Sequence, residues 1–394
     1  WDGDRLTESA RESLAEIFAR PKTIQRHAPF KRPELNLAPW PTLITAMGRL
    51  SDATLLAIVG HNLPQVVLAY TPEDEWVAHM ATVYAERARE LGLRKVQLLP
   101  TDYLAANLHA HLPAELAGRA TVNVTPGTKP QGMALGLWAK NHGVPAWAIE
   151  RETIRRLDKT GETMPVRGLS LKARLDFTVE TQVTDYGWGN HSPDWNNDLP
   201  YQKLLRFMNL ALDRGLAGDL RRRDLELDGF GLVLIDRVSR LWRFGWPAEG
   251  GRGAGTLDLL GGFWYEKLAA KAVDALNHSG RVAWDVSCGV EVSSPGSDRY
   301  LTERDVLAAN SRAQLFMVSC KTAARPKDKF LAMYAAEALA MAKTLGRFVV
   351  PVICDMSTDP PKTVEGVMAI GWTTLCRPKA LSAALESAAK AVHG

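Results

Sequence analysis

An aspartate and a lysine in the last third of the chain have the types and spacing that metal-dependent phosphodiester cleavage requires. Asp305 lies near the start of an apolar run, residues 304–308, and Lys321 follows a second run, residues 314–320. A polar turn at residues 310–312 separates the runs, so the pattern predicts two antiparallel strands of a hairpin. Such strands bring the start of one beside the end of the other. We expect Asp305 to hold a divalent cation, Mn²⁺ or Mg²⁺, and Lys321 to position a water or offset transition-state charge.

Three short segments form a motif with this pair: two contain Asp305 and Lys321, and the third lies upstream of them. They are Gly261-Gly262-Phe263-Trp264-Tyr265-Glu266, Glu303-Arg304-Asp305-Val306-Leu307 and Ser319-Cys320-Lys321-Thr322. Their order resembles the motifs of the PD-(D/E)xK nuclease superfamily, and more closely those of the nuclease half of CRISPR-associated CARF effectors. The resemblance implies a metal site built on Asp305 and Glu266, with Glu303 and Lys321 also in the catalytic set.

Ser319 stands where that family usually places its second metal-binding carboxylate. A hydroxyl is a neutral and poor ligand for a hard cation, so the change removes one negative charge from the site. Glu266 or Glu303 could compensate from a neighbouring position. Two interpretations follow: an active metal-dependent nuclease, or a degenerate site in a domain that only binds nucleic acid.

The composition is that of a globular protein with two cores. The chain has 394 residues, of which 46% are hydrophobic and 23% charged, and its net charge is +4. These values exclude wholesale disorder and permit contact with nucleic acid without requiring it. No apolar run reaches the length of a membrane span and no secretion signal is visible, so we expect a cytoplasmic protein without membrane contact. No C-x-x-C spacing occurs, which predicts four reduced thiols in the core: Cys288, Cys320, Cys354 and Cys376.

The N-terminal half alternates strand and helix patterns after residue 41. Continuous apolar runs predict strands, and the segment 72–91 has a helical pattern with acids at its start and Gly92 after its end. Alternation of this kind predicts a Rossmann-like parallel sheet. The expected strands are residues 53–60, 65–70, 95–99, 120–124 and 147–150.

The loop at residues 123–130 is the informative segment of this half. It follows a buried strand and precedes a helix expected over residues 131–141, and so lies where such sheets bind ligands. Amides at a helix start, threonine hydroxyls and Lys129 can cradle a phosphate, and Gly127 permits close approach to the backbone. It is not a Walker sequence, and an ordinary threonine-glycine turn is the alternative.

The same loop resembles the T-G-G-T-K motif of CARF domains, with Pro126 replacing the first glycine. These domains are dimeric sensors of cyclic oligoadenylates made by type III CRISPR complexes. The resemblance implies a homodimer that binds one ring, cyclic tetra-adenylate, at its two-fold axis. It assigns Thr125, Gly127, Thr128 and Lys129 to the ring, with Gln131 nearby. The family's first ligand loop follows strand one, and we match it to residues 60–64 with His61 and Asn62, although an earlier strand near Leu37 is the other option.

The remaining segments complete four expected regions. We expect a helix and arm (1–40), a CARF domain (41–155), a connector (156–250) and a restriction-endonuclease-like domain (251–394). Interleaved arginines and tryptophans at 232–246 fit either a grip on single strands or an amphipathic connector. Further expected elements are helices at 5–20, 151–159, 201–216, 257–276, 329–345 and 380–392, a strand pair at 171–183, and strands at 284–292 and 347–354.

These features predict a cyclic-oligoadenylate-activated nuclease that cleaves DNA or RNA in type III CRISPR antiviral defence. A ligand-gated nucleic-acid-binding effector with a dead site is one alternative. A stand-alone Rossmann enzyme in which Lys129 is catalytic is another.

Overall fold

A computed structural model describes the chain from residue 39 to residue 393, and residues 35–394 belong to one compact unit. The helix expected at residues 5–20, and the arm up to residue 38, lie outside the described residues. Further residues that are not described are 50–51, 151–152, 167–168, 179–181, 186, 190–198, 217–223, 237–240, 250–252, 260–261, 280–281, 294–299, 313, 323–327, 347–348 and 357–359.

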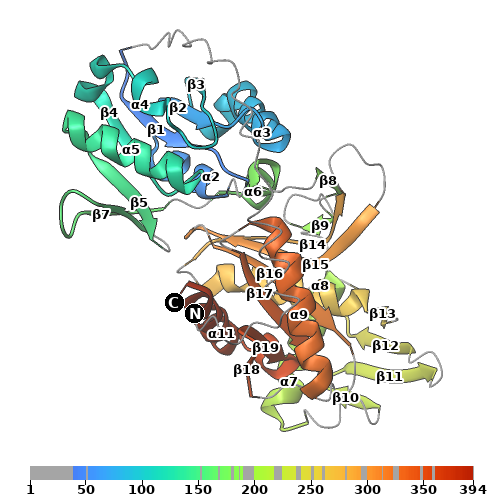
Figure 1. Cartoon of the computed structure of the whole chain (residues 1–394). Coiled ribbons are helices and arrows are strands. Elements are labelled where there is room, and N and C mark those ends of the chain that lie inside the picture. Colours follow the sequence, from blue (N-terminus) through green and yellow to red (C-terminus); the bar gives the residue numbers. More distant parts are fainter. Residues whose placement is uncertain are drawn as a thin grey trace, which may run out of the picture. The chain divides into compact units, whose positions relative to one another are not determined.

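The first sheet has seven strands in the order β3-β2-β1-β4-β5-β6-β7 (Figure 1). Neighbours among β1 to β5 are parallel, and β6 and β7 add an antiparallel edge. The strands are β1 (Thr42–Ala46), β2 (Gln65–Tyr70), β3 (Lys95–Pro100), β4 (Ala120–Asn123), β5 (Ala146–Glu150), β6 (Thr153–Arg156) and β7 (Thr163–Pro165).

Helices cover both faces of this sheet, as the Rossmann-like prediction requires. Helices α2 (Asp52–His61) and α3 (Glu75–Glu86) pack against one face, and α4 (Leu108–His111) and α5 (Lys129–His142) against the other. The side chain of Asp74 caps α3 by accepting from the Val77 amide. Two 3₁₀ helices, Ala88–Leu91 and Ala114–Arg119, lead into β3 and β4.

The strand expected at residues 53–60 is wrong, because this run forms most of α2. Asp52 accepts a hydrogen bond from the Ala53 amide at the helix start. Residues 52–58 are all buried, so this part of the helix is covered on every side. A short continuous apolar run does not distinguish a buried strand from a buried helix, which explains the error. The first described strand is therefore β1, at residues 42–46.

The second large sheet has the order β18-β19-β17-β16-β15-β14-β8 and carries the expected hairpin. Strands β14, β15 and β16 are antiparallel, and β16, β17 and β19 are parallel. The short strand β9 (Trp188–Gly189) pairs with β14 off this path. The strands are β8 (Gln182–Asp185), β14 (Trp284–Ser293), β15 (Tyr300–Asn310), β16 (Leu315–Lys321), β17 (Val349–Asp355), β18 (Lys362–Val364) and β19 (Val367–Gly371).

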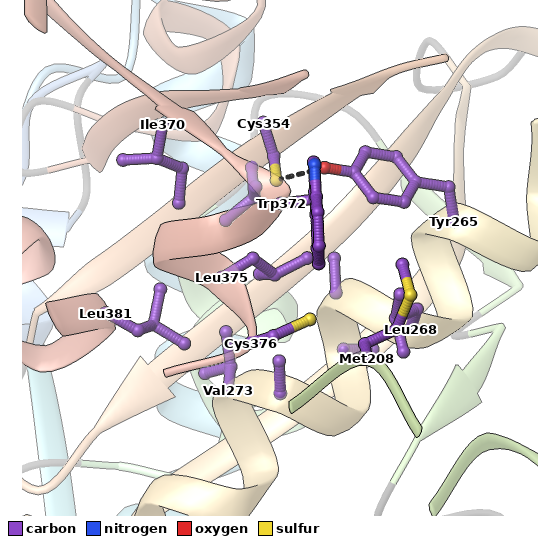
Figure 2. Close-up of a cluster of buried hydrophobic side chains, with 14 of the residues drawn as sticks. Met208, Tyr265, Leu268, Val273, Cys354, Ile370, Trp372, Leu375, Cys376 and Leu381 are labelled. Atoms are coloured by element: carbon purple, nitrogen blue, oxygen red, sulfur yellow. Dashed lines mark hydrogen bonds between the residues drawn. The ribbon is translucent and has the colours of Figure 1, made fainter. Parts of the chain in front are cut away.

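Two hydrophobic clusters flank this second sheet. Helix α9 (Asp328–Leu345) covers one face, and α8 (Phe263–Asp274) and α11 (Pro378–His393) cover the other. Figure 2 shows the α8 side, where Tyr265 and Cys354 meet within a cluster that includes Trp372 of α10 (Trp372–Leu375). A 3₁₀ helix, Ala275–Ser279, follows α8. All four cysteines are free, as expected.

Helix α6 (Leu171–Thr178) replaces the strand pair expected at residues 171–183, of which only β8 is a strand. The Ser170 hydroxyl accepts from the Ala173 amide and so caps the helix, a signal that the strand interpretation overlooked. Leu171 and Leu175 belong to the cluster under α9, whereas Phe177 belongs to the cluster of the first sheet. One short helix thus contributes to two cores.

The helix expected at residues 151–159 is also wrong, because this segment contains the strand β6. Ile154 is fully buried, while Arg155 and Arg156 form ion pairs with Glu150 and Asp158. With only one buried apolar residue among charged neighbours, the segment shows no hydrophobic period that would distinguish a strand from a helix.

A third, antiparallel sheet has the order β10-β11-β12-β13 and packs with α7 (Leu199–Asp213) into the α8 cluster. Residues 232–246 contribute two of its strands instead of a connector. Arg243 is paired with Asp258 and Trp246 is buried, so neither is placed to grip a single strand. The helix expected from residue 257 begins only at Phe263. The strands are β10 (Leu225–Leu227), β11 (Phe230–Asp236), β12 (Leu241–Trp246) and β13 (Gly255–Leu259).

Candidate functional site

Asp305 lies inside the hairpin, where two groups of β16 hold its carboxylate. The backbone amide of Cys320 donates to Oδ2 of Asp305 at 2.6 Å, and the Ser319 hydroxyl donates to the same oxygen at 3.3 Å. Burial raises the pKa of Asp305 above its ordinary value, while the Cys320 amide and the Lys321 ammonium act in the opposite direction. The hairpin therefore fixes the orientation of this carboxylate and leaves Oδ1 for another partner.

Lys321 ends β16 and lies within electrostatic range of both Asp305 and Glu266. Its Nζ is 3.4 Å from Oε2 of Glu337 and 5.0 Å from the ring centre of Tyr334, both on α9. The Lys321 side chain keeps 21% of its surface exposed. The ammonium group is thus held by α9 at the edge of the site while remaining open to a substrate.

Glu266 approaches from α8 and completes an acidic group. Burial raises the pKa of Glu266 to about 7, and repulsion from Asp305 and Glu303 adds to the shift, against the opposing effect of Lys321. Glu266 thus lies within electrostatic range of Asp305, Glu303 and Lys321. Nearby carboxylates that resist ionisation together are a group that a bound cation would stabilise.

Tyr265 explains how Glu266 is positioned. Its hydroxyl donates to the carbonyl of Asp355 at 2.9 Å and lies 3.1 Å from Sγ of Cys354, both on β17 (Figure 2). The Tyr265 side chain is fully buried, so this contact fixes the first turn of α8 against the sheet. The adjacent residue, Glu266, is consequently presented at the edge of the core.

The donor set fits a hard cation that keeps part of its water shell. Among the described residues, no three His, Cys, Asp or Glu side chains are arranged to hold a metal ion. Mg²⁺ commonly binds through one or two carboxylates, with water and substrate phosphate completing its shell. Asp305 and Glu266 supply such a pair, and Ser319 contributes a neutral hydroxyl.

The pKa of Glu266 predicts how the metal-free protein responds to pH. The unfolded carboxyl loses its proton near pH 4.5, while the folded one keeps it until about pH 7. The contribution of Glu266 to the free energy of unfolding should therefore fall as pH rises through this window, by about 1 kcal/mol after allowance for solvent screening of a half-buried group. Denaturant titrations in chelator at pH 4.5 and pH 8, compared between wild type and Glu266→Gln, isolate this contribution.

Glu266→Gln should remove this contribution, since an amide does not titrate, and the pH dependence of the other groups should remain. Glu386→Gln on α11, an exposed position, should leave the Glu266 contribution unchanged. Equal pH slopes in wild type and Glu266→Gln would contradict the assignment.

Sequence reasoning missed Glu337 and Tyr334. Both lie on the helix expected at residues 329–345, and neither was considered as a residue of the site. Glu337 is the only acid of α9 after its first residue, which is the one signal available in the sequence. Its contact with Lys321 depends on the packing of α9 across β16, which sequence spacing does not specify.

The loop after β4 is organised as a capping box. The Thr128 hydroxyl accepts from the Gln131 amide at 3.3 Å, and the Gln131 carboxamide oxygen accepts from the Thr128 amide at 2.9 Å. Nε2 of Gln131 also donates to the hydroxyls of Thr71 and Thr101. Gln131 is fully buried, so it braces the loop from below.

Of the other loop residues, Thr125 is hydrogen-bonded to the protein and Lys129 is exposed to solvent. The Thr125 hydroxyl accepts from the Ile149 amide at 2.6 Å, which ties the loop to β5. Lys129, by contrast, is the exposed first residue of α5. Among the predicted ligand residues of this loop, Lys129 is the most exposed group for an anion.

Two glycines bring this loop against the loop that follows β1. A Cβ atom on Gly48 would lie 3.2 Å from the Cα of Gly127. Gly127 has a φ of 86°, and a Cβ there would meet the Ala46 Cβ at 2.5 Å and Oε1 of Gln131 at 2.6 Å. The two loops therefore meet backbone to backbone at the carboxyl edge of the sheet, where such folds bind ligands.

His61 and Asn62 do not follow strand one. They lie at the end of α2, and the loop after β1 begins instead at Met47. Nε2 of His61 is 3.2 Å from Nδ2 of Asn123, and burial lowers the pKa of His61 to about 4. His61 is consequently a neutral acceptor below β4, and the match to residues 60–64 was wrong in its topology.

Comparison with known proteins finds solved structures that have this fold. No protein-family model matches the chain, and no curated protein matches it in sequence. Among solved structures, protein VC1899 from Vibrio cholerae superposes with a TM-score of 0.57 at 15% identity, over 88% of this chain and 98% of its own. Can2 from Sulfobacillus thermosulfidooxidans, solved with cyclic tetra-adenylate, gives 0.52 at 13% identity, over 90% and 98%.

A type III CRISPR defence DNA nuclease activated by cyclic oligoadenylate gives a TM-score of 0.56 at 18% identity. The superposition includes 95% of this chain and 55% of the chain of that nuclease. This chain shares their fold. The predicted fold class, a Rossmann-like α/β domain joined to a second α/β domain, is thereby confirmed. Among the described residues, no helix combines the length and apolar character that crossing a membrane requires.

Proposed function

We propose that this protein is a metal-dependent nuclease that a cyclic oligoadenylate activates, with a role in type III CRISPR antiviral defence. The observation that carries the proposal is the convergence of Asp305, Glu266 and Lys321 from three elements at one end of the β15–β16 hairpin. Two carboxylates beside an ammonium group suit hydrolysis of a phosphodiester in DNA or RNA.

Each residue of the site has a defined task in this proposal. Asp305 and Glu266 would hold Mn²⁺ or Mg²⁺, with Glu303 within electrostatic range of Glu266, and such a cation would supply polarisation of the phosphate and a more acidic water. Lys321 donates to that water or to the phosphate oxygens as negative charge develops. Glu337 keeps the Lys321 ammonium in place, and the Cys320 amide keeps the Asp305 carboxylate in place.

The activator would bind at the two loops that meet at Gly48 and Gly127. Their contact leaves backbone, not side chains, at the carboxyl edge of the sheet, and Lys129 supplies a positive charge there. A cyclic tetra-adenylate carries phosphates that such a site can hold. Thr125, Thr128 and Gln131 support the loop through their hydrogen bonds.

A homodimer is part of the proposal, and exposed apolar side chains of the CARF domain support it. Four of them lie on α5 and on the segment after β3, where a second copy would cover them. These residues are Tyr103, Leu104, Met133 and Leu137, with 66%, 63%, 69% and 56% of their surfaces exposed.

The test is a cleavage assay with both nucleic acids. Purified protein is incubated with supercoiled plasmid or single-stranded RNA and Mn²⁺, with no ring or with cyclic tri-, tetra- or hexa-adenylate. Cleavage only in the presence of cyclic tetra-adenylate supports the proposal. Unchanged substrates under every condition would refute it.

Ser319 favours a second candidate, an activated nucleic-acid-binding protein whose nuclease site is degenerate. Ser319→Asp distinguishes the two, because a second carboxylate beside Asp305 adds a ligand for the cation. If the site is active, the metal concentration for half-maximal cleavage should fall about tenfold, since ligand charge sets affinity. Cleavage by Ser319→Asp with none by wild type would instead support the degenerate site.

A further inference from the structure

Lys267 lies one residue beyond Glu266 and is surrounded by aromatic rings. Its Nζ is 4.7 Å from the ring centre of Trp188, 4.9 Å from that of Phe263 and 5.5 Å from that of Tyr201. Within the described part of the chain, no carboxylate forms an ion pair with this ammonium group. The rings hold the Lys267 charge by cation–π attraction without neutralising it.

Phe263 extends this cluster to the acidic site. Its side chain has 47% of its surface exposed, although it begins a helix whose next residues enter the core. A Cβ atom on Gly289 would lie 3.6 Å from the Phe263 ring and 3.0 Å from Oε1 of Glu303. The exposed ring and the Glu303 carboxylate are therefore neighbours above the same point of β14.

We propose that Phe263 and Lys267 form a platform for one nucleotide next to the scissile phosphate of a single-stranded nucleic acid. The base stacks on the open side of Phe263, and Lys267 contacts the adjoining phosphate. The inference rests on the proposed function, which it deepens by assigning substrate-binding residues and strandedness. In a duplex the neighbouring base pairs cover each base face, whereas in a single strand the face is available to an aromatic ring.

Charge supports this placement of the strand. Glu266, Glu303 and Asp305 repel a phosphate chain, so the chain needs cations beside them. Lys321 supplies one from β16, and Lys267, whose Nζ lies 4.9 Å from the ring centre of Phe263, supplies another next to the platform. A strand that places its scissile phosphate near Asp305 can therefore place a neighbouring nucleotide on Phe263.

The experiment measures binding without cleavage. Fluorescence anisotropy of a labelled single-stranded oligonucleotide is followed against the full chain in chelator, for wild type and variants. Phe263→Ala should weaken binding about tenfold, the effect expected for loss of one stacked base. Phe263→Trp should retain affinity, and Lys267→Ala should lower affinity and reduce the salt slope by about one.

Ile235→Ala is the matched control, because Ile235 on β11 is also an apolar side chain with 47% exposure. Thermal melts establish that each variant is folded. Wild-type affinity in Phe263→Ala, a loss in Phe263→Trp as large as that in Phe263→Ala, or equal binding of a duplex would each overturn the platform.

The platform and the proposed function fail in different ways. Cleavage by wild type together with unchanged binding by Phe263→Ala overturns the platform and leaves the function standing. Single-strand binding that depends on Phe263 and Lys267, without cleavage under any ring or metal, overturns the function and leaves the platform. A wild-type chain that binds no single-stranded oligonucleotide overturns the platform, and the cleavage assay with plasmid, ring and Mn²⁺ then decides the function by itself.

Discussion

Asp305→Asn and Lys321→Ala should each lower the rate of metal-dependent cleavage by at least about 10²-fold, the cost of removing one group that stabilises transition-state charge. An asparagine at position 305 keeps an oxygen for the Cys320 amide, whose bond to Asp305 is 2.6 Å. The fold of the hairpin is therefore preserved while the charge that binds the cation is lost. Single-turnover cleavage of a labelled substrate, with activator and Mn²⁺ saturating, measures the loss.

Glu337→Gln provides the graded comparison for these variants. It leaves the Lys321 charge intact and removes only the negative charge 3.4 Å from its ammonium group, so a loss of a few-fold is expected, in line with a partly exposed ion pair. Asp258→Asn, which breaks an exposed ion pair with Arg243, is the control for removing an acid elsewhere. Cleavage by Asp305→Asn at the wild-type rate would remove the basis of the proposed chemistry.

Gly127→Val should prevent activation. The backbone at Gly127 has a φ of 86°, and a Cβ would meet Ala46 and Gln131 at 2.5 and 2.6 Å. The loop has to move away from Gly48, and displacement of about 1 Å is enough to weaken a precise site by about 100-fold. Calorimetric titration with cyclic tetra-adenylate, together with cleavage at fixed ring concentration, measures the effect.

Gly143→Ala separates backbone strain from steric clash in this experiment. Gly143 has a positive φ of 64° at the end of α5, but a Cβ there would meet nothing within 4 Å. This variant should lose some stability and keep its response to the ring. An activated Gly127→Val protein, or loss of activation in a well-folded Gly143→Ala protein, would argue against a ligand site at the paired loops.

The hairpin and the helix that follows the loop after β4 were predictable because their signals are local. The polar turn at residues 310–312 separates two apolar runs, and the capping box at Thr128 and Gln131 begins a helix that ends before Gly143. The run at residues 53–60 was not predictable in the same way. Its helical state depends on burial against neighbouring elements on all sides, which composition alone does not reveal.

Of the candidate site, the sequence predicted only the residues that lie on the expected hairpin or in a recognisable motif. Asp305 and Lys321 follow from the geometry of a hairpin, and Glu266 follows from a resemblance. The positions of Glu337 and Phe263 depend on how α9 and α8 pack across the sheet, since neither contact is close in sequence. Residues that reach a site from a helix packed on the sheet can be identified only from the tertiary structure.

Helix α6 makes the two halves of the chain interdependent in folding. Leu171 and Leu175 complete one hydrophobic cluster and Phe177 completes another, while the Tyr84 hydroxyl donates to the Phe177 carbonyl and the Leu171 amide donates to Asp285. If either core unfolded, the apolar side chains that α6 packs into it would be exposed to water. The helix itself would then be destabilised, and the other core would lose the side chains that α6 contributes to it. We therefore expect the two α/β domains to melt as one cooperative unit, without a populated intermediate in which only one of them is native.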